Sequence, residues 1–419
     1  MQRTNVIERP TYQRLLESYR ETEQVKVLQG IRRCGKSTLM ELFCDSLRAG
    51  GVAQENLFYR RFDMLGMPFE MSGETLVRDV TQARAHANRN ETFYVFLDEV
   101  QEVTGWEKAV RQLHTAPGVD VYLTGSNARI LSSELATLLA GRTVTLDVYP
   151  LSFTEYLDFV NTLDHKETPF PSSVDELFAR YVRFGGMPSL FSLRTQDEQT
   201  ITRELSSIFD TVLLNDVAKR LGIRDIALLE RLVAYLFSTS GNLFSTRKVT
   251  GALTSIGRKA SASTVESYIA ALRQAFIINE VYQTGASGKE LLAPLRKFYP
   301  ADTGLRNFAS RFSSQNLGFQ LENVVYLELR RRGFSVKVGV TDRAEIDFVA
   351  RKLDQKTYVQ VSQSVLSEEV RGRELAPLRG VGDSFPKMLL TLDRFDLGTT
   401  QDGIRIVNLV DWLREEDPA

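Results

Sequence analysis

The fold is decided by the stretch VKVLQGIRRCGKS, which spans residues 25–37. It begins with VKVLQ, a compact apolar run of the kind found in buried parallel strands. The run passes directly into GIRRCGKS, residues 30–37, which matches the pattern G-x-x-x-x-G-K-[ST] at every fixed position. The helical pattern KSTLMELFCDSLRAG follows at once. A strand, a glycine-rich loop and a helix in this order predict a phosphate-binding loop.

The chemistry of such a loop assigns roles to its residues. Backbone N–H groups turn inward around the phosphates, and the helix N-terminus adds a partial positive charge. We expect Lys36 to reach the β- and γ-phosphates of a nucleotide and the Ser37 hydroxyl to hold Mg²⁺. A chance glycine-rich turn is the alternative, which the flanking strand and helix disfavour. The residues predicted to bind the nucleotide are Gly30, Ile31, Arg32, Arg33, Cys34, Gly35, Lys36, Ser37 and Thr38.

A second motif, FYVFLDE at residues 93–99, is an apolar strand that ends in two acids. We expect Asp98 to bind Mg²⁺ and Glu99 to polarise the attacking water, which makes Glu99 a catalytic candidate beside Lys36. Alone, such acids are often solvated strand ends, but after a complete phosphate loop they indicate a hydrolase. No N-K-x-D motif for reading guanine is present, so ATP is the expected nucleotide.

Around these motifs, short β-rich runs alternate with helical patterns. Further strands are predicted at 57–62, 119–125 and 143–149. The alternation predicts an α/β fold, with a parallel sheet covered by helices on both faces. We expect this ATPase domain to span residues 1–155, followed by a helical linker region over 156–240.

Composition excludes several classes of protein. Hydrophobic residues make up 43% of the 419 residues and charged ones 25%, which is typical of globular chains. The two cysteines, Cys34 and Cys44, exclude a disulfide scaffold and are expected to be small buried hydrophobes rather than a redox switch. No apolar run approaches the length of a membrane span and no signal peptide precedes the fold, so a cytoplasmic location without membrane attachment is expected.

Four segments occur in a characteristic order: GIRRCGKSTL, FLDEVQEVTGWE, YLTGSN and AGRTVTLDVYPLSFTEYL. They are followed by YVRFGGMP, LLNDVAKR, STVESYIAAL, KFYPADTGL and LENVVYLELRRRG. On these segments the chain resembles, over nearly its whole length, a family of bacterial and archaeal AAA-type ATPases with an appended C-terminal domain of unknown function. The resemblance implies an AAA-type P-loop domain that hydrolyses ATP with Mg²⁺.

The resemblance implies two further catalytic residues. Asn127 stands where such ATPases carry a polar sensor of the γ-phosphate, although Ser126 or Asn127 would also serve as a helix N-cap. Arg142 stands where related ATPases place an arginine finger that acts on a neighbouring subunit of a homo-oligomer. The alternative is a surface arginine behind the helix-ending Gly141.

Residues 241–311 resemble a winged-helix module, with STVESYIAAL as its recognition helix. The chain as a whole has a net charge of −1, but residues 241–310 hold nine basic and four acidic side chains, a net +5. We therefore weigh DNA or RNA contact evenly against a protein partner. The basic residues that flank the helix are Arg247, Lys248, Arg258 and Lys259.

Residues 312–419 resemble a restriction-endonuclease-like domain, in which two acids and a lysine activate water at a phosphodiester. Asp347 fits the first acid and Glu322 an accessory one. Gln360 and Ser362 stand where the second acid and the lysine belong, so we expect a retained fold without cleavage. An active enzyme would need substitutes from nearby, for instance Lys356 or Glu345.

Together these features predict Mg²⁺-dependent ATP hydrolysis coupled to a conformational switch of C-terminal modules. Two alternatives stay open at this point. One is an ATP-gated nuclease, and the other is a nucleotide-bound signalling or scaffold protein with little turnover.

Overall fold

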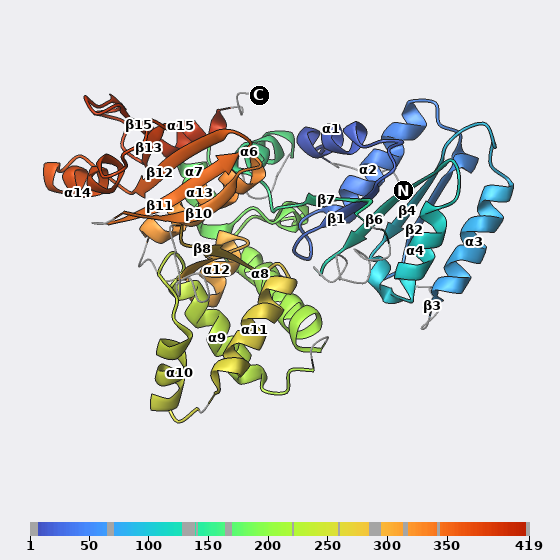
Figure 1. Ribbon diagram of the computed structural model, residues 1–419, viewed down its shortest axis with the longest axis horizontal. Coiled ribbons are helices and arrows are strands. Elements are labelled where there is room, and N and C mark those ends of the chain that lie inside the picture. The colour runs from blue at the N-terminus through green and yellow to red at the C-terminus, as the bar shows by residue number, and fades with distance from the viewer. Residues whose placement is uncertain are drawn as a thin grey trace. The chain divides into compact units, whose positions relative to one another are not determined.

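The structure is a computed structural model that describes residues 7–64, 71–127, 139, 141–163, 170–219, 222–258, 260–284, 295–312, 317–341 and 344–415. Internal contacts divide the chain into two compact units (Figure 1). The first comprises residues 1–148 with 274–276, and the second comprises residues 149–273 with 277–419. Among the described residues, no helix has the length and apolarity that a membrane crossing needs.

The first unit is built on a five-stranded parallel sheet in the order β2-β4-β6-β1-β7. All five strands predicted from the sequence are present, so the predicted sheet is confirmed. The strands are β1 (Val25–Gln29), β2 (Leu57–Arg61), β4 (Phe93–Asp98), β6 (Val119–Gly125) and β7 (Thr143–Asp147), and a separate short pair joins β3 (Met71–Ser72) to β5 (Val103–Thr104).

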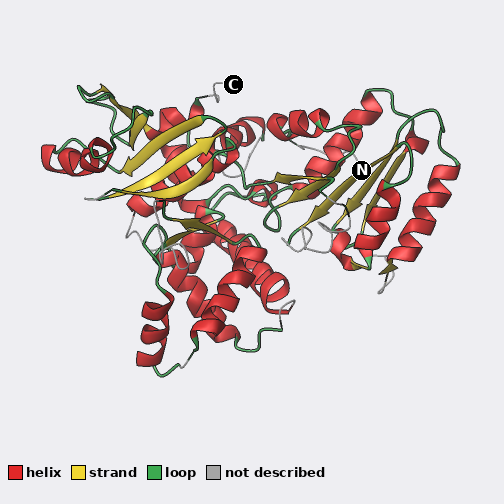
Figure 2. Ribbon diagram, viewed as in Figure 1, coloured by secondary structure: helices red, strands yellow, loops and turns green. Residues whose placement is uncertain are grey.

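Helices cover both faces of this sheet, as its uninterrupted apolar strands require (Figure 2). On one face, Val95 and Leu97 of β4 pack with side chains of α3 and α4. On the other, Phe96 of β4 and Tyr122 of β6 contact Phe43 of α2. The helices of this unit are α1 (Pro10–Ser18), α2 (Lys36–Ala49), α3 (Gly73–Ala85) and α4 (Trp106–His114).

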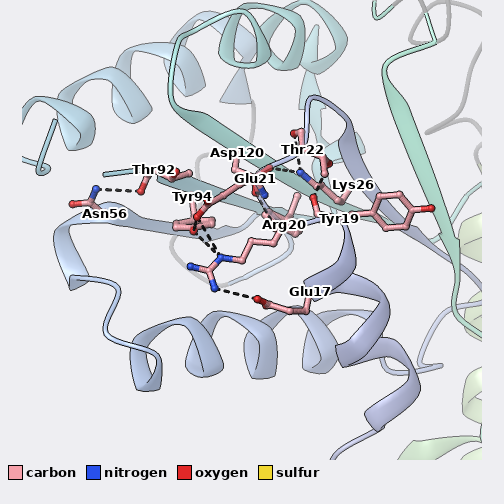
Figure 3. Close-up of polar contacts among 11 residues, drawn as sticks. Glu17, Tyr19, Arg20, Glu21, Thr22, Lys26, Asn56, Thr92, Tyr94 and Asp120 are labelled. Atoms are coloured by element: carbon pink, nitrogen blue, oxygen red, sulfur yellow. Dashed lines mark hydrogen bonds and ion pairs between the residues drawn. The ribbon is translucent and has the colours of Figure 1, made fainter. Parts of the chain in front are cut away.

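The amino edge of the sheet holds a buried ion pair between Lys26 of β1 and Asp120 of β6 (Figure 3). Asp120 Oδ2 also accepts hydrogen bonds from the Tyr122 hydroxyl at 2.9 Å and from the Glu21 backbone N–H at 2.8 Å. Lys26 Nζ donates a second bond to the Thr22 carbonyl at 3.2 Å. These contacts fasten the segment before β1 to the sheet.

The second unit contains a six-stranded mixed sheet in the order β10-β11-β12-β13-β15-β14. Its central strands β12, β13 and β15 run parallel, while β10, β11 and β14 add antiparallel edges. Leu375 and Leu378 of α14 pack on this sheet. The strands are β10 (Ser335–Val340), β11 (Glu345–Lys352), β12 (Gln355–Ser362), β13 (Lys387–Thr391), β14 (Gly398–Thr399) and β15 (Ile404–Asn408).

Helices and one hairpin make up the rest of the second unit. A run of three helices, α9, α10 and α11, leads into the antiparallel hairpin of β8 (Ile278–Tyr282) and β9 (Arg296–Pro300). The helices are α6 (Phe153–Thr162), α7 (Val174–Phe184), α8 (Glu198–Thr211), the π-helical η5 (Val212–Lys219), α9 (Ile226–Ser238), α10 (Thr246–Ser255), α11 (Ala262–Gln274), α12 (Thr303–Ala309), α13 (Leu317–Arg331), α14 (Glu368–Arg379) and α15 (Leu409–Arg414).

Candidate nucleotide site

The carboxyl ends of the parallel strands bring the sequence motifs to one edge of the first sheet. Gln29 at the end of β1 lies in register with Gly125 of β6 on one side and Asp147 of β7 on the other. The loop over residues 30–35 therefore begins between the ends of two neighbouring strands. Ligands of open parallel sheets bind at this edge.

The loop backbone depends on a glycine at its first position. Gly30 has φ +153°, and a Cβ there would lie 2.1 Å from the carbonyl oxygen of Val148. Gly35, with φ +103°, is the N-cap of α2, so the loop opens onto the start of a helix. This arrangement of strand, loop and helix N-terminus is the one that the chemistry of a phosphate site needs.

Lys36 is buried, and its ammonium group is bonded to the loop itself. Its side chain is 4% exposed. Nζ donates to the carbonyl oxygens of Gly30 at 2.9 Å and Ile31 at 3.1 Å. The charge is thus held inside the curve of the loop by two carbonyl acceptors.

Asp98 is the centre of a hydrogen-bonded group at the same edge. Its Oδ1 accepts from the Ser37 hydroxyl at 3.0 Å and from the Thr124 hydroxyl. Its Oδ2 accepts from the Tyr59 hydroxyl at 3.3 Å and lies 3.7 Å from Arg61 Nε. Complete burial raises the pKa of Asp98, which the bonds from Thr124 and Ser37 partly offset.

Glu99 follows in a left-handed backbone conformation, with φ +55°. Its N–H donates to Thr124 Oγ1 at 2.9 Å, and its carboxylate accepts from the Gln101 side-chain amide. Thr124 therefore connects Asp98 to the backbone of Glu99. A left-handed φ is uncommon for a residue other than glycine, and such residues concentrate at functional sites.

Asn127 and Arg142 lie at opposite ends of the parallel strands, Asn127 at the carboxyl ends and Arg142 at the amino ends. Asn127 follows the carboxyl end of β6 and is 4% exposed, on the side of the phosphate loop. Arg142 is exposed and precedes β7, where its carbonyl accepts from the Val25 N–H at 2.9 Å. It lies near His114, whose pKa is lowered by burial and then by the Arg142 charge. The structure thus places Arg142 away from the loop of its own chain.

The donor set at this edge fits a nucleotide with Mg²⁺. A serine hydroxyl and a carboxylate 3.0 Å apart are the hard oxygen ligands that Mg²⁺ takes beside phosphate oxygens. Three neighbouring residues that sequence reasoning missed, Tyr59, Arg61 and Thr124, also contact Asp98. The signal available for them was their position at the ends of predicted strands, which meet at one edge of a parallel sheet.

Beyond the first unit, Glu322, Asp347 and Gln360, which the sequence singled out, lie together in a second polar cluster. Asp347 Oδ2 accepts from the Val361 N–H at 2.8 Å, and the Asp347 N–H donates to Gln360 Oε1 at 3.2 Å. Gln360 Nε2 donates to Glu374 Oε2 at 3.1 Å, so both ends of its amide are engaged. The Ser362 hydroxyl donates to the Ser364 carbonyl instead.

A lysine from the β8–β9 hairpin also belongs to this polar cluster. Lys297 of β9, which sequence reasoning missed, lies 2.5 Å from Glu345 Oε1 and 3.7 Å from Glu322 Oε2. Lys356, the substitute suggested from the sequence, pairs with Asp383 at 2.7 Å. Burial raises the pKa of Asp347 to about 6 and that of Glu322 well above its usual range.

Comparison with known proteins agrees with the geometry of the first unit. A family profile described as an AAA domain matches residues 22–157, and one described as a domain of unknown function matches residues 175–316. An uncharacterized protein of Haemophilus influenzae is 36% identical over 408 residues, which are 97% of this chain and 98% of that protein. An uncharacterized protein of Methanocaldococcus jannaschii is 29% identical over 84% of this chain and 77% of its own length.

Solved structures of similar fold include a Walker-type ATPase. The Walker-type ATPase of Pyrococcus abyssi superposes with a TM-score of 0.51 at 17% sequence identity, covering 73% of this chain and 97% of that one. At this identity the match supports the fold alone. The match to the AAA domain profile agrees with the fold of this structure, and the Haemophilus influenzae relative extends over nearly the whole chain.

Proposed function

Because the chain belongs to the family of AAA-type P-loop ATPases with an appended domain of unknown function, we propose that it couples Mg²⁺-dependent ATP hydrolysis to a change in its C-terminal modules. The AAA-type fold supports nucleotide binding and hydrolysis. The observation that carries the finer proposal is the contact of the Ser37 hydroxyl with Asp98, directly beside the buried Lys36.

In this proposal the loop binds the phosphates through its backbone N–H groups, and Lys36 exchanges two carbonyl partners for phosphate oxygens. Ser37 and Asp98 would hold Mg²⁺, which supplies positive charge to the phosphates when bound. Glu99 orients the water for in-line attack on the γ-phosphorus. Its backbone is already fixed by Thr124, which limits the reorganisation that the step requires.

Asn127 is proposed to sense the γ-phosphate, since it follows a strand that ends beside the loop. Arg142 is proposed to act on the site of another copy of the chain, because its own loop lies at the opposite edge of the sheet. A homo-oligomer is therefore part of the proposal. An Arg142→Ala chain mixed with a Lys36→Ala chain should recover hydrolysis that neither has alone.

Phosphate release tests the hydrolase proposal. We expect Lys36→Ala and Glu99→Gln each to abolish most of the ATPase activity of the wild type, because Lys36→Ala removes the positive charge at the phosphates and Glu99→Gln removes the carboxylate that orients the water. The exposed variants Lys108→Ala and Glu74→Gln are matched controls that should retain it. A wild-type rate no higher than that of Lys36→Ala would instead favour a nucleotide-bound signalling or scaffold protein.

For the later residues we propose the division given by the sequence, with a helical region over 156–240 and a winged-helix module over 241–311 that contacts DNA. The order of α10, α11 and the β8–β9 hairpin supports the module over 241–311, and α9 lies before residue 241, in the helical region. Arg247 and Lys248 are exposed, while Arg258 pairs with Asp225 at 3.4 Å and Lys259 lies outside the described residues.

Binding of a fluorescent duplex at several salt concentrations tests that contact. The variant Arg247→Ala/Lys248→Ala should weaken binding about equally for all sequences and reduce the salt dependence. Stimulation of phosphate release by the duplex in the wild type would connect both halves of the chain. A salt slope unchanged by the double substitution would favour a protein partner.

We propose that residues 312–419 do not cleave nucleic acid. Both polar ends of Gln360 and the hydroxyl of Ser362 are engaged within the chain, and neither side chain can carry the charge of the acid or the lysine that it stands for. Plasmid nicking with Mg²⁺ and ATP should be equal for the wild type and Asp347→Ala. Nicking that is lost in Asp347→Ala would support the ATP-gated nuclease.

A further inference from the structure

A buried arginine from the segment before β1 contacts the phosphate loop. Arg9 directly precedes α1 and is 3% exposed. Its Nη1 donates to the carbonyl oxygen of Cys34 at 3.1 Å, across a separation of 25 residues in the sequence. Arg9 lies outside both nucleotide motifs, so the motifs alone do not indicate it. The contact falls on the last peptide of the loop, directly before Gly35 and Lys36.

Arg9 is held in this position by its neighbours in the first unit. Pro10 begins α1 directly after it, and the fixed φ of proline suits the first residue of a helix. The Arg9 carbonyl accepts the Tyr12 N–H at 3.0 Å, and the guanidinium lies over the Tyr12 ring, 4.5 Å from the ring centre. Gln13 Nε2 donates to the Leu39 carbonyl of α2 at 3.4 Å. The guanidinium therefore reaches the loop from beside a short helix that is itself bonded to α2.

The Cys34 carbonyl belongs to the peptide that also carries the Gly35 N–H. A peptide is planar and trans, so its carbonyl and its N–H point in opposite directions. Because the Cys34 carbonyl is turned toward Arg9, the Gly35 N–H points away from Arg9. Among the described residues, no backbone carbonyl of a turn, loop or cap accepts this N–H. It is one of the donors that a loop of this kind offers to phosphates.

The glycine in this peptide explains why a fixing contact matters here. Turning the peptide over changes the ψ angle of Cys34 and the φ angle of Gly35, which is +103°. Glycine populates positive and negative φ about equally well, so the Gly35 side of the peptide offers little resistance. The bond from Arg9 opposes this rotation. A loop whose N–H groups are already oriented loses less binding energy to ordering when a phosphate arrives.

We propose that Arg9 is a positioning residue of the nucleotide site, which fixes the Cys34 peptide so that the Gly35 N–H can donate to a phosphate. This role rests on the nucleotide binding proposed for the loop. Arg9 acts through the loop instead of touching the nucleotide, because its guanidinium is buried and bonded to the Cys34 carbonyl. Since ATP and ADP both place phosphates in such a loop, the affinity for both should depend on Arg9, and the chemical step should not.

Titration of the full chain with fluorescent analogues of ATP and ADP tests this role. We expect Arg9→Met to raise the Kd of both about tenfold, the value of one hydrogen bond to a charged group, with the number of sites per chain unchanged. A merely structural role would instead lower the number of chains that bind and leave the Kd of the others as it was. Arg9→Lys keeps a charged donor on a long side chain and should recover most of the affinity.

Phosphate release gives a second readout of the same role. In Arg9→Met, KM for ATP should rise by the factor found for Kd, and kcat should change by less than about twofold, because the loop contacts phosphates in the ground state and the transition state alike. Partial unfolding would do the reverse, since it lowers the concentration of active chains and leaves KM unchanged.

Two further variants near Arg9 are matched controls. Gln13→Met removes a bond from α1 to the backbone of α2, and Arg14→Met removes the same charge from an exposed position. Both should bind ATP and ADP as the wild type does. If Arg9→Met does not fold, Tyr12→Leu decides, because it removes the ring against which the guanidinium lies and should raise both Kd values about threefold.

Three results overturn the role of Arg9. The first is a Kd that a folded Arg9→Met chain, or Tyr12→Leu in its place, leaves unchanged. The second is binding by Arg9→Lys that is no tighter than binding by Arg9→Met. The third is an equal loss in Arg14→Met, which would assign the effect to net charge. A wild-type chain that binds neither nucleotide would refute the proposed function itself, so the two failures can be told apart.

Discussion

At the scale of single residues, the candidate nucleotide site depends on hydroxyl groups as much as on charges. Asp98 is completely buried, and such a carboxylate is costly unless donors surround it. Ser37, Tyr59 and Thr124 supply these donors from three different elements. Thr124 differs from the others because its oxygen also accepts the Glu99 N–H, so one side chain sets the position of two acids.

Thr124→Val should therefore slow ATP hydrolysis, although the carboxylates of Asp98 and Glu99 remain. The change removes a hydrogen bond to a carboxylate, worth about 1.5–3 kcal/mol, so phosphate release is expected to fall about ten- to a hundredfold. Thr104→Val, at an exposed position of β5, is the control. Equal rates for the two variants would contradict the linking role of Thr124.

Gly30→Ala tests whether the phosphate loop must pack closely against the backbone of Val148, the residue that follows β7. Because the added Cβ would lie 2.1 Å from the Val148 carbonyl oxygen, the loop must shift, and the affinity for a fluorescent ATP analogue should fall at least about tenfold. Gly51→Ala is the control, since Gly51 also has a positive φ, of +96°, but nothing lies within 4 Å of its Cβ position. It should lose about 1 kcal/mol of stability and no affinity.

At the scale of elements, β1 is held at both ends by different means. Its carboxyl end leads into the loop, and its amino end is fixed by the pairing of Lys26 with Asp120 across to β6 (Figure 3). Both side chains are almost fully buried. A buried pair adds little compared with apolar residues of the same shape, but losing one partner leaves a charge without compensation.

Lys26→Met should accordingly lower the free energy of unfolding by about 3–5 kcal/mol, measured in urea. Adding Asp120→Asn should restore part of this loss, because Asn keeps an acceptor for Tyr122 and Glu21 without the charge. The exposed pair of Arg48 with Asp45 offers a control, and Arg48→Met should change stability by no more than about 0.5 kcal/mol. A double variant less stable than Lys26→Met would refute the argument.

Some features of these elements were predictable from the sequence, and others were not. The phosphate loop and the strand ending in Asp98 are contiguous patterns, so local reasoning located both. The start of α11 is set by Ser261, whose hydroxyl accepts the Thr264 N–H at 3.0 Å. Glu266, two residues beyond Thr264, is bound by Arg296 of β9 at 2.6 and 2.7 Å, a contact that the local sequence does not indicate.

At the scale of the whole molecule, residues far apart in sequence join to complete the sites, and this is where sequence reasoning fails. The contacts of Tyr59 and Thr124 with Asp98 follow only from the strand order β2-β4-β6. Lys297 reaches Glu345 from another hairpin, a contact that no spacing between motifs indicates. The strands of the first sheet could be predicted from the sequence, but the hydrogen-bond partners of each acid could be identified only from the three-dimensional structure.

In the second unit, Asp302 likewise connects two segments that are far apart in the sequence. Its carboxylate accepts from the Leu305 N–H at 3.0 Å, capping α12, and from the Gly186 N–H at 2.7 Å, more than a hundred residues earlier in the chain. Complete burial raises the pKa of Asp302 from 3.8 to about 6, although these donors oppose the rise. The folded chain therefore binds a proton more tightly here than the unfolded chain.

This shift predicts a pH dependence of stability. Between about pH 4 and 6 the folded state holds a proton that the unfolded state has lost, so the contribution of Asp302 to stability falls as the pH rises. Asp302→Asn should remove up to about 3 kcal/mol of that fall, measured by urea unfolding at pH 4 and pH 7. Asp197→Asn, a helix cap at an exposed residue, is the control. Identical pH profiles for the wild type and Asp302→Asn would disprove the assignment.

The bonding of Lys36 to the carbonyls of its own loop has a consequence for how long a nucleotide stays. An incoming phosphate that displaces both carbonyls would gain only the difference between its own bonds to the ammonium group and the two that it replaces. We therefore expect bound nucleotide to exchange quickly, so that its identity would follow the ratio of ATP to ADP in solution. Displacement of a fluorescent ADP analogue by excess ATP measures this rate, and exchange over hours would contradict the expectation.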